Sequence, residues 1–142
     1  MYRYLTNEEL VCFQNGKAKQ LGVFPSVENL ESSKKYKPDV KYLHFFKNIK
    51  DLPRVQEFEK DSGGGYIGVF DLPLRIAISG KGVGKYFEQS RIGNVQPIKE
   101  VAIETKFLRT SNLMCYVFDK NCNLPADEVI KQIEETMQML GS

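Results

Sequence analysis

Residues that build disulfide frameworks and metal centres are scarce in this 142-residue sequence, which has three cysteines and one histidine. The cysteines are odd in number and form no CxxC pair, so we expect no disulfide framework and a reducing, cytoplasmic compartment. A structural zinc site needs four paired Cys or His ligands, whereas the four such residues here are scattered along the chain: Cys12, His44, Cys115 and Cys122. The sequence therefore predicts free, buried thiols and no metal.

Long apolar runs and an excess of one charge are also missing. No run approaches the roughly 20 residues of a membrane span, and the first ten residues have no apolar signal-peptide core. Lys and Arg number 20 and Asp and Glu 18, a formal net charge of +2. This balance gives no reason to expect nucleic acid or a membrane as partner, and leaves a small molecule or another protein. Hydrophobic residues make up 42%, enough for a folded core.

The apolar patterns predict a single α+β domain over residues 1–142, with an antiparallel or mixed sheet and flanking helices. Strands are expected near residues 1–5, 41–46, 66–71, 99–106 and 113–118. Thr6 and Glu9 are spaced as a capping box, which predicts a first helix that ends at Gly16. Further helices are expected after Ser26, over residues 48–60, and from Pro125 to Leu140, the last with an apolar stripe of Val129, Ile130, Ile133, Met137 and Leu140.

A run of glycines follows the short alternating segment Leu74 to Ile78: Gly80, Gly82 and Gly84. A P-loop requires GxxxxGK followed by Ser or Thr, but here Gly84-Lys85 is followed by Tyr86, and the GxGxxG spacing is also absent. Glycines that allow a tight turn are the first interpretation. The alternative is a glycine loop over a ligand, with Lys81 and Lys85 nearby.

His44 is the only histidine and lies in the middle of the strand expected at residues 41–46. Alternation puts it on the same face as Tyr42 and Phe46, so it is either a packing residue or part of a flat aromatic surface that a ring-shaped ligand could stack on. No GxSxG elbow occurs in the sequence, which argues against a Ser-His-Asp hydrolase.

Two glutamates share one face of the strand expected at residues 99–106. Glu100 and Glu104 point opposite to Val101 and Ile103, because side chains alternate along a strand. A solvated sheet face is the simpler interpretation. The other is a pair of carboxylates that open onto a cleft, where either could bind a ribose hydroxyl or stabilise a cationic sugar transition state.

Three stretches resemble proteins of the ADP-ribosyltransferase fold. Residues 2–10, YRYLTNEEL, resemble the opening Y-R-x-L-(S/T)-x-x-E-L strand and helix of that family. Residues 41–46, KYLHFF, are similar to its next core strand, and residues 99–103, KEVAI, to the late strand that carries the family's glutamate. With YIGVFDLP at residues 66–73, the same stretches also resemble a group of small bacterial proteins with no activity that we can state.

The resemblance implies a site that uses NAD as substrate. Arg3 would hold the NAD phosphates or the nicotinamide ribose, and Glu100 would bind a ribose hydroxyl and favour the oxocarbenium-like state as nicotinamide leaves. His44 departs from the family pattern at its position and is a second catalytic candidate. Tyr42 and Tyr66 are candidate stacking rings for the cofactor, with Tyr86 as a further one.

Two functions therefore stay open. The first is an ADP-ribosyltransferase or NAD glycohydrolase, which requires Arg3, His44 and Glu100 to converge on one cleft. The second is a non-catalytic module of α+β fold that binds a ligand or a protein.

Overall fold

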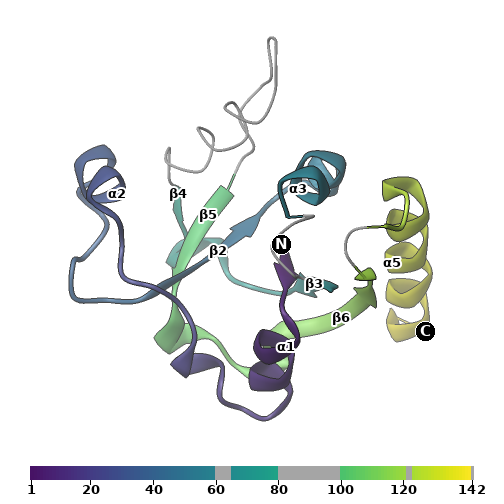
Figure 1. Cartoon of the computed structure of the whole chain (residues 1–142). Coiled ribbons are helices and arrows are strands. Elements are labelled where there is room, and N and C mark those ends of the chain that lie inside the picture. Colours follow the sequence, from purple (N-terminus) through teal and green to yellow (C-terminus); the bar gives the residue numbers. More distant parts are fainter. Residues whose placement is uncertain (60–64, 80–99, 121–122, 142) are drawn as a thin grey trace, which may run out of the picture.

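The chain folds around one antiparallel sheet (Figure 1). The computed structural model describes residues 1–59, 65–79, 100–120 and 123–141. Over these residues six strands lie in the order β4-β5-β2-β1-β3-β6, each antiparallel to its neighbours: β1 (Tyr2–Leu5), β2 (Tyr42–Phe46), β3 (Tyr66–Phe70), β4 (Ile78–Ser79), β5 (Glu100–Glu104) and β6 (Leu113–Phe118). The helices are α1 (Asn7–Gln14), α2 (Val27–Ser32), α3 (Leu52–Glu59) and α5 (Ala126–Gly141). The α+β class with an antiparallel sheet is confirmed.

Most predicted elements occur where the sequence places them, and the differences lie at short turns. The strand expected at residues 99–106 ends at Glu104, because Thr105–Phe107 form a 3-10 helix, η4. The helix expected at residues 48–60 begins as a 3-10 turn, η2 (Ile49–Asp51), before α3. The apolar alternation after β3 suggests a strand, but Leu74–Ile76 form another 3-10 turn, η3. Only the two residues of β4 that follow are a strand. The glycine run lies outside the described residues.

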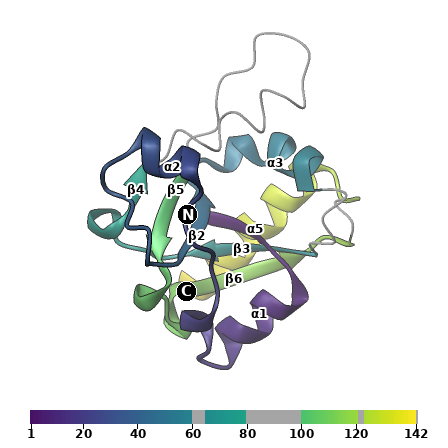
Figure 2. The same cartoon turned by 60° about the vertical axis from the view of Figure 1, so that its left-hand side comes forward.

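The two faces of the sheet carry separate apolar clusters, as alternation along each strand requires. One face packs against α3 and α5 and is called the α3/α5 face; its buried strand residues are Tyr4, Phe46, Ile67, Val69, Cys115 and Val117. The other packs against α1 and is called the α1 face; its buried strand residues are Leu5, Leu43, Phe45, Phe70, Val101 and Ile103. Figure 2 shows α1 below the sheet and α3 above it.

The N-terminal cap of α1 and most of the apolar stripe of α5 are confirmed. The Thr6 hydroxyl accepts a hydrogen bond from the Glu9 N–H, and the Glu9 carboxylate accepts one from the Thr6 N–H. In α5, Val129 and Ile133 are buried in the cluster of the α3/α5 face. Leu140 was expected in this stripe but is 59% exposed, because the last turn of α5 extends beyond that cluster.

The two cysteines that the structure describes carry free thiols. Cys115 is buried in β6 and Cys12 is half-buried in α1, while Cys122 lies outside the described residues. Burial raises the pKa of the Cys115 thiol above its usual value. The thiol is therefore protonated and unreactive at neutral pH, as expected of a packing cysteine.

Gly22→Ala is expected to lower the free energy of unfolding by about 2–3 kcal/mol, because two separate obstacles oppose a side chain there. The Gly22 φ of +94° is in the left-handed region, and a Cβ would overlap the Thr105 methyl group and lie 2.9 Å from the Tyr42 carbonyl oxygen. Gly22 thus allows the long connection before β2 to dock on Tyr42, where Val23 forms a β-bridge.

Urea denaturation of Gly22→Ala beside Gly141→Ala measures this loss. A Cβ at Gly141 meets nothing within 4 Å, so the matched control should keep the stability of the parent. Equal stability of the two variants would show that the connection can leave Tyr42 at no cost.

Candidate functional site

Three titratable side chains, those of Tyr36, His44 and Glu100, lie on one stretch of the α3/α5 face. Strand pairing sets the position of two of them: His44 of β2 lies opposite Ala102 of β5, and Phe46 lies opposite Glu100. His44 and Glu100 are therefore diagonal neighbours on adjacent strands, about 7–8 Å apart between their Cα atoms. The Ala102 methyl group lies beside His44 and the Phe46 ring beside Glu100 on the same face.

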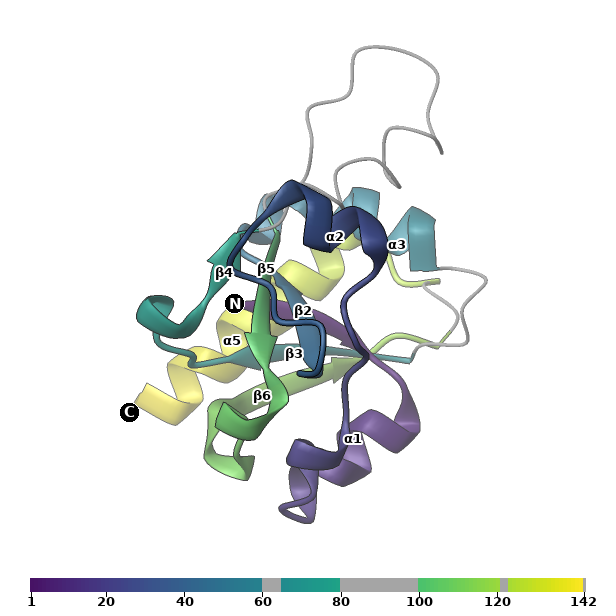
Figure 3. The same ribbon diagram turned by 90° about the vertical axis from the view of Figure 1, so that its left-hand side faces the viewer.

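Tyr36 reaches the same stretch from the connection between α2 and β2. Its ring packs edge-on against Tyr42, with 5.1 Å between the ring centroids, and Leu30 packs against the small cluster of Tyr36, Tyr42 and Ala102. Figure 3 shows α2, which carries Leu30, at the end of the molecule where β4 and β5 also lie. Tyr36 is 5% exposed, and its hydroxyl has no hydrogen-bond partner among the described residues. Burial, followed by the charges of Glu100 and Tyr42, raises the pKa of Tyr36 to about 12. The phenol is therefore neutral and buried.

His44 is half-buried, and its imidazole is neutral at pH 7. Its Nε2 atom is inaccessible and has no hydrogen-bond partner in the part of the chain that the structure describes. Burial, and then the charge of Arg3, lower the pKa of His44 from 6.5 to about 4. A buried nitrogen without a partner costs about 1–3 kcal/mol of stability, so packing alone does not account for a histidine at this position.

Glu100 completes the cluster at the start of β5. Burial raises the pKa of its carboxyl group from 4.5 to about 8; the charge of Arg3 works against this shift and that of Glu59 adds to it. Among the described residues no hydrogen bond or ion pair engages this carboxyl group. At neutral pH all three groups of the Tyr36–His44–Glu100 cluster are thus uncharged, and each can both donate and accept hydrogen bonds.

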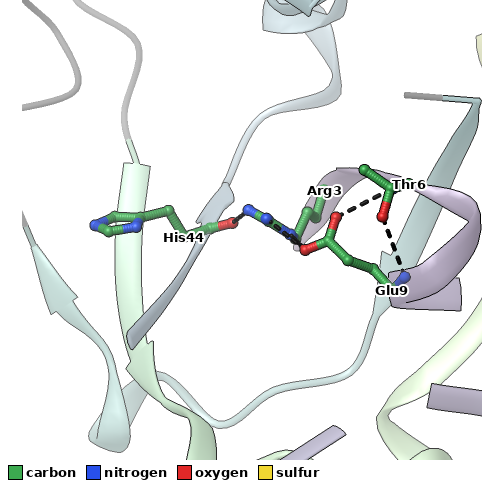
Figure 4. A network of polar contacts seen from close by, with 4 residues as sticks. All are labelled: Arg3, Thr6, Glu9 and His44. Carbon is green, nitrogen blue, oxygen red and sulfur yellow. Dashed lines mark hydrogen bonds and ion pairs between the residues drawn. The ribbon is translucent and has the colours of Figure 1, made fainter. Parts of the chain in front are cut away.

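The Arg3 side chain, expected to hold the NAD phosphates or ribose, is engaged by two partners within the protein. Its guanidinium donates to the Glu9 carboxylate at 2.7 Å and to the His44 carbonyl oxygen at 2.8 Å (Figure 4). Arg3 leaves β1 on the α1 face, as Leu5 does, whereas the imidazole of His44 points away from it. β1 pairs with β2 only at Tyr2. The Arg3 guanidinium therefore donates to the His44 carbonyl oxygen, which in a longer strand pair would accept from a backbone N–H.

A double-mutant cycle of Arg3→Lys and Glu9→Gln is expected to give a coupling energy of about 1 kcal/mol in urea denaturation. The reason is that the planar fork of Arg3 binds Glu9 and the His44 carbonyl at once, and a lysine ammonium cannot reproduce both contacts. The two side chains are only 23% and 15% exposed, so solvent screens the pair weakly. A coupling energy indistinguishable from zero would remove this structural role.

The two predicted stacking tyrosines do not share a surface. Tyr42 is completely buried, and its hydroxyl accepts a hydrogen bond from the Lys37 N–H at 2.9 Å. Tyr66 lies on the α1 face, where its ring contacts those of Tyr116 and Phe118. The structure therefore brings His44, Glu100 and Tyr42 together on one face and leaves the side chains of Arg3 and Tyr66 on the other. Gly82, Gly84 and Tyr86 lie outside the described residues.

Glu104 shares a face with Glu100, as alternation predicts, but that face is not solvated at Glu104. The residue is 8% exposed, with Lys106 at 3.1 Å and Lys37 at 3.8 Å from its carboxylate oxygens. Glu104 is thus neutralised by two lysines, while Glu100 is not paired with any described cation. The two glutamates differ in chemistry although their pattern in the sequence is the same.

Sequence reasoning missed Tyr36 and Glu59. Tyr36 lies in a connection without apolar periodicity, and only the β2 register and the ring contact with Tyr42 bring it to the cluster. Glu59 is the last residue of α3, and its effect on Glu100 depends on how α3 crosses the sheet. Neither placement has a local signal in the sequence.

Comparison of the chain with models of known families, with curated proteins and with solved structures found no match. Among the helices of the described residues, none combines the length and the apolar character needed to cross a bilayer. No three His, Cys, Asp or Glu side chains in the same ranges are grouped so that they could hold a metal ion.

Proposed function

We propose that the protein is a binding module that takes up a small polar molecule at the Tyr36–His44–Glu100 cluster. The observation that carries this proposal is that two of the buried polar atoms without a hydrogen-bond partner among the described residues, Tyr36 Oη and His44 Nε2, belong to this cluster. Buried polar atoms in folded proteins are nearly always paired. A ligand that supplies the missing hydrogen bonds accounts for both atoms at once.

The positions of the side chains favour binding over NAD turnover. The Nε, Nη1 and Nη2 atoms of Arg3 already donate to Glu9 and to the His44 carbonyl oxygen, so the guanidinium has no free pair of N–H donors for a pyrophosphate. Tyr42 is buried beneath Tyr36 and presents no open ring. NAD turnover by Glu100 and His44 stays a prediction, and the same experiment tests it.

The test uses His44 as its own reporter, because the one histidine of the sequence gives a single Cε1–H imidazole resonance in ¹H–¹³C NMR spectra. Four probes are added at about 10 mM each: NAD, D-ribose, n-butyrate and n-butylammonium. At least one should shift the His44 resonance in a saturable way, and release of nicotinamide from NAD is followed in parallel.

Tyr36→Phe is the variant that links such a shift to the cluster, since it removes the hydroxyl and keeps the ring. It should weaken binding of the active probe about tenfold. Tyr116→Phe is the matched control, because Tyr116 is 43% exposed on the α1 face and should leave binding unchanged. The absence of any saturable shift with all four probes would overturn the proposal. If the protein releases nicotinamide from NAD and Glu100→Gln abolishes that release, the protein is an NAD-consuming enzyme and the binding-module proposal is wrong.

A further inference from the structure

We infer that the outer edge of β6 binds the same edge of a second copy of this chain, so that two sheets join into one. Among the described residues the sheet has two edge strands, β4 and β6 (Figure 1). β4 has two residues, and so short an edge strand offers little for another chain to pair with. β6 has six residues and, among the described strands, pairs with β3 alone. This interface does not depend on the proposed ligand site.

The backbone groups that point outward from β6 belong to every second residue of the strand. The Asp119 N–H bonds to the carbonyl oxygen of Gly65, the residue before β3. Because N–H and C=O groups alternate between the two sides of an antiparallel strand, Met114, Tyr116 and Phe118 point away from β3. No residue in the described ranges bonds to the N–H or C=O groups of these three.

The side chains along this edge are apolar. β6 has no charged residue and no proline, the usual devices that keep an edge strand from pairing. Met114, Tyr116 and Phe118 are between 39% and 53% exposed on the α1 face, whereas Cys115 and Val117 are buried on the α3/α5 face. One row of exposed apolar side chains therefore follows the same residues whose backbone groups point outward.

The edge of a second copy matches this edge in register. A two-fold axis perpendicular to the sheet at Tyr116 places Tyr116 opposite its own equivalent and Met114 opposite Phe118. All the outward-pointing groups of the strand then form hydrogen-bonded pairs, whereas any other two-fold register leaves at least one such residue unpaired. The assembly closes at two copies, because each chain has one such edge.

The charges beside β6 are also compatible with a second copy. Asp119 is fully buried within its own copy, and Lys120 falls opposite Asn112, which is neutral. The two-fold register therefore brings no like charges together, which would destabilise paired strands. An acidic or basic peptide would find no complementary charge along β6, so a second copy is the occupant that this strand favours.

The available area makes this a weak dimer. An aromatic side chain presents roughly 200 Å², so the exposed parts of the three outward side chains amount to about 300 Å² per copy. Stable interfaces bury about 1,200–2,000 Å² in total, and smaller ones belong to transient complexes. We therefore expect a dissociation constant of about 100 µM.

Sedimentation equilibrium of the whole chain from about 1 µM to 1 mM tests this pairing. We expect monomer and dimer with no larger species. Tyr116→Lys and Tyr116→Glu each place like charges opposite each other at the axis and should weaken the dimer at least tenfold. An equimolar mixture of the two variants should restore it, because opposite charges then face each other. Leu74→Lys, the same kind of change at an exposed apolar position of η3, should leave the dimer unchanged.

Amide hydrogen exchange followed by NMR locates the contact on the strand edge. The N–H groups of Met114, Tyr116 and Phe118 should exchange about threefold more slowly at 1 mM than at 50 µM protein, while those of Cys115 and Val117, which face β3, should not change. A protein that stays monomeric at 1 mM, a dimer that tolerates Tyr116→Lys, or a mixture of the two charged variants that fails to associate would each overturn the inference.

Discussion

Glu100→Gln is expected to make the protein more stable than the parent at pH 8.5, by about 3 kcal/mol in the free energy of unfolding. The folded parent must hold a buried carboxyl group whose pKa is raised to about 8, while the unfolded chain ionises it at its ordinary value of 4.5. Between these values the folded state keeps a proton that the unfolded state has lost. Stability therefore falls as the pH rises from 4.5 to 8, and an uncharged glutamine removes this loss.

The pKa of His44 produces the opposite slope at lower pH. Its folded value of about 4 lies below the ordinary 6.5, so the unfolded state binds the extra proton between these values. Stability consequently rises with pH over that range. In the parent the slopes from His44 and Glu100 oppose each other between pH 4.5 and 6.5, and only the loss from Glu100 remains up to pH 8. In Glu100→Gln the rise from pH 4 to 6.5 should appear alone and end in a plateau.

Urea denaturation of parent and variant across pH 4–9 measures both profiles. Glu31→Gln, at an exposed position of α2, should follow the parent at every pH. A Glu100→Gln protein that is less stable than the parent by the same amount at all pH values would show that the folded state uses Glu100 as a paired carboxylate. The cluster would then be satisfied without a ligand.

Asp119→Ala is expected to cost about 4 kcal/mol, a large share of the stability of a small protein. The Asp119 carboxylate is fully buried at the end of β6. It accepts hydrogen bonds from the Tyr4 hydroxyl at 2.7 Å, the Gln56 amide at 2.9 Å and the Leu124 N–H at 2.9 Å. These donors come from β1, α3 and the segment before α5, and alanine would leave all three without an acceptor.

Two milder variants make this prediction measurable even if Asp119→Ala fails to fold. Tyr4→Phe removes one donor and should cost about 1–2 kcal/mol. Asp119→Asn keeps one acceptor oxygen and should be intermediate between Tyr4→Phe and Asp119→Ala. Lys120→Ala, at the exposed neighbouring position, should have little effect. If Asp119→Ala is destabilised no more than Lys120→Ala, the three donors find other partners and the network does not join these elements.

The fold is largely predictable from this sequence because its signals are local. The capping box at Thr6, the alternation around His44 and the stripe that contains Val129 each depend on residues within a few positions of one another. The differences occur where tertiary contacts override the local pattern. Leu74 and Ile76 alternate like a strand but belong to the 3-10 turn η3.

The candidate site is less predictable, because its chemistry depends on which strands become neighbours. The sequence pattern identifies His44 on an aromatic strand face and Glu100 on a strand face that is either solvated or open to a cleft. It gives no sign that β2 and β5 are adjacent. The family resemblance that places Arg3 at a ligand gives no sign of its contacts with the His44 carbonyl oxygen and Glu9. Asp119 has no distinguishing sequence context, although its carboxylate accepts three hydrogen bonds from described residues.

The pH titration of the His44 imidazole by NMR tests the central claim most directly, that Tyr36, His44 and Glu100 form a partly buried cluster that is uncharged at neutral pH. One resonance reports on two groups, because His44 is the only histidine and Glu100 is its diagonal neighbour. We expect a main inflection near pH 4 and a smaller one near pH 8 that disappears in Glu100→Gln. A single inflection between about pH 6 and 7, the range of a histidine in water, would contradict the buried cluster and the binding site built on it.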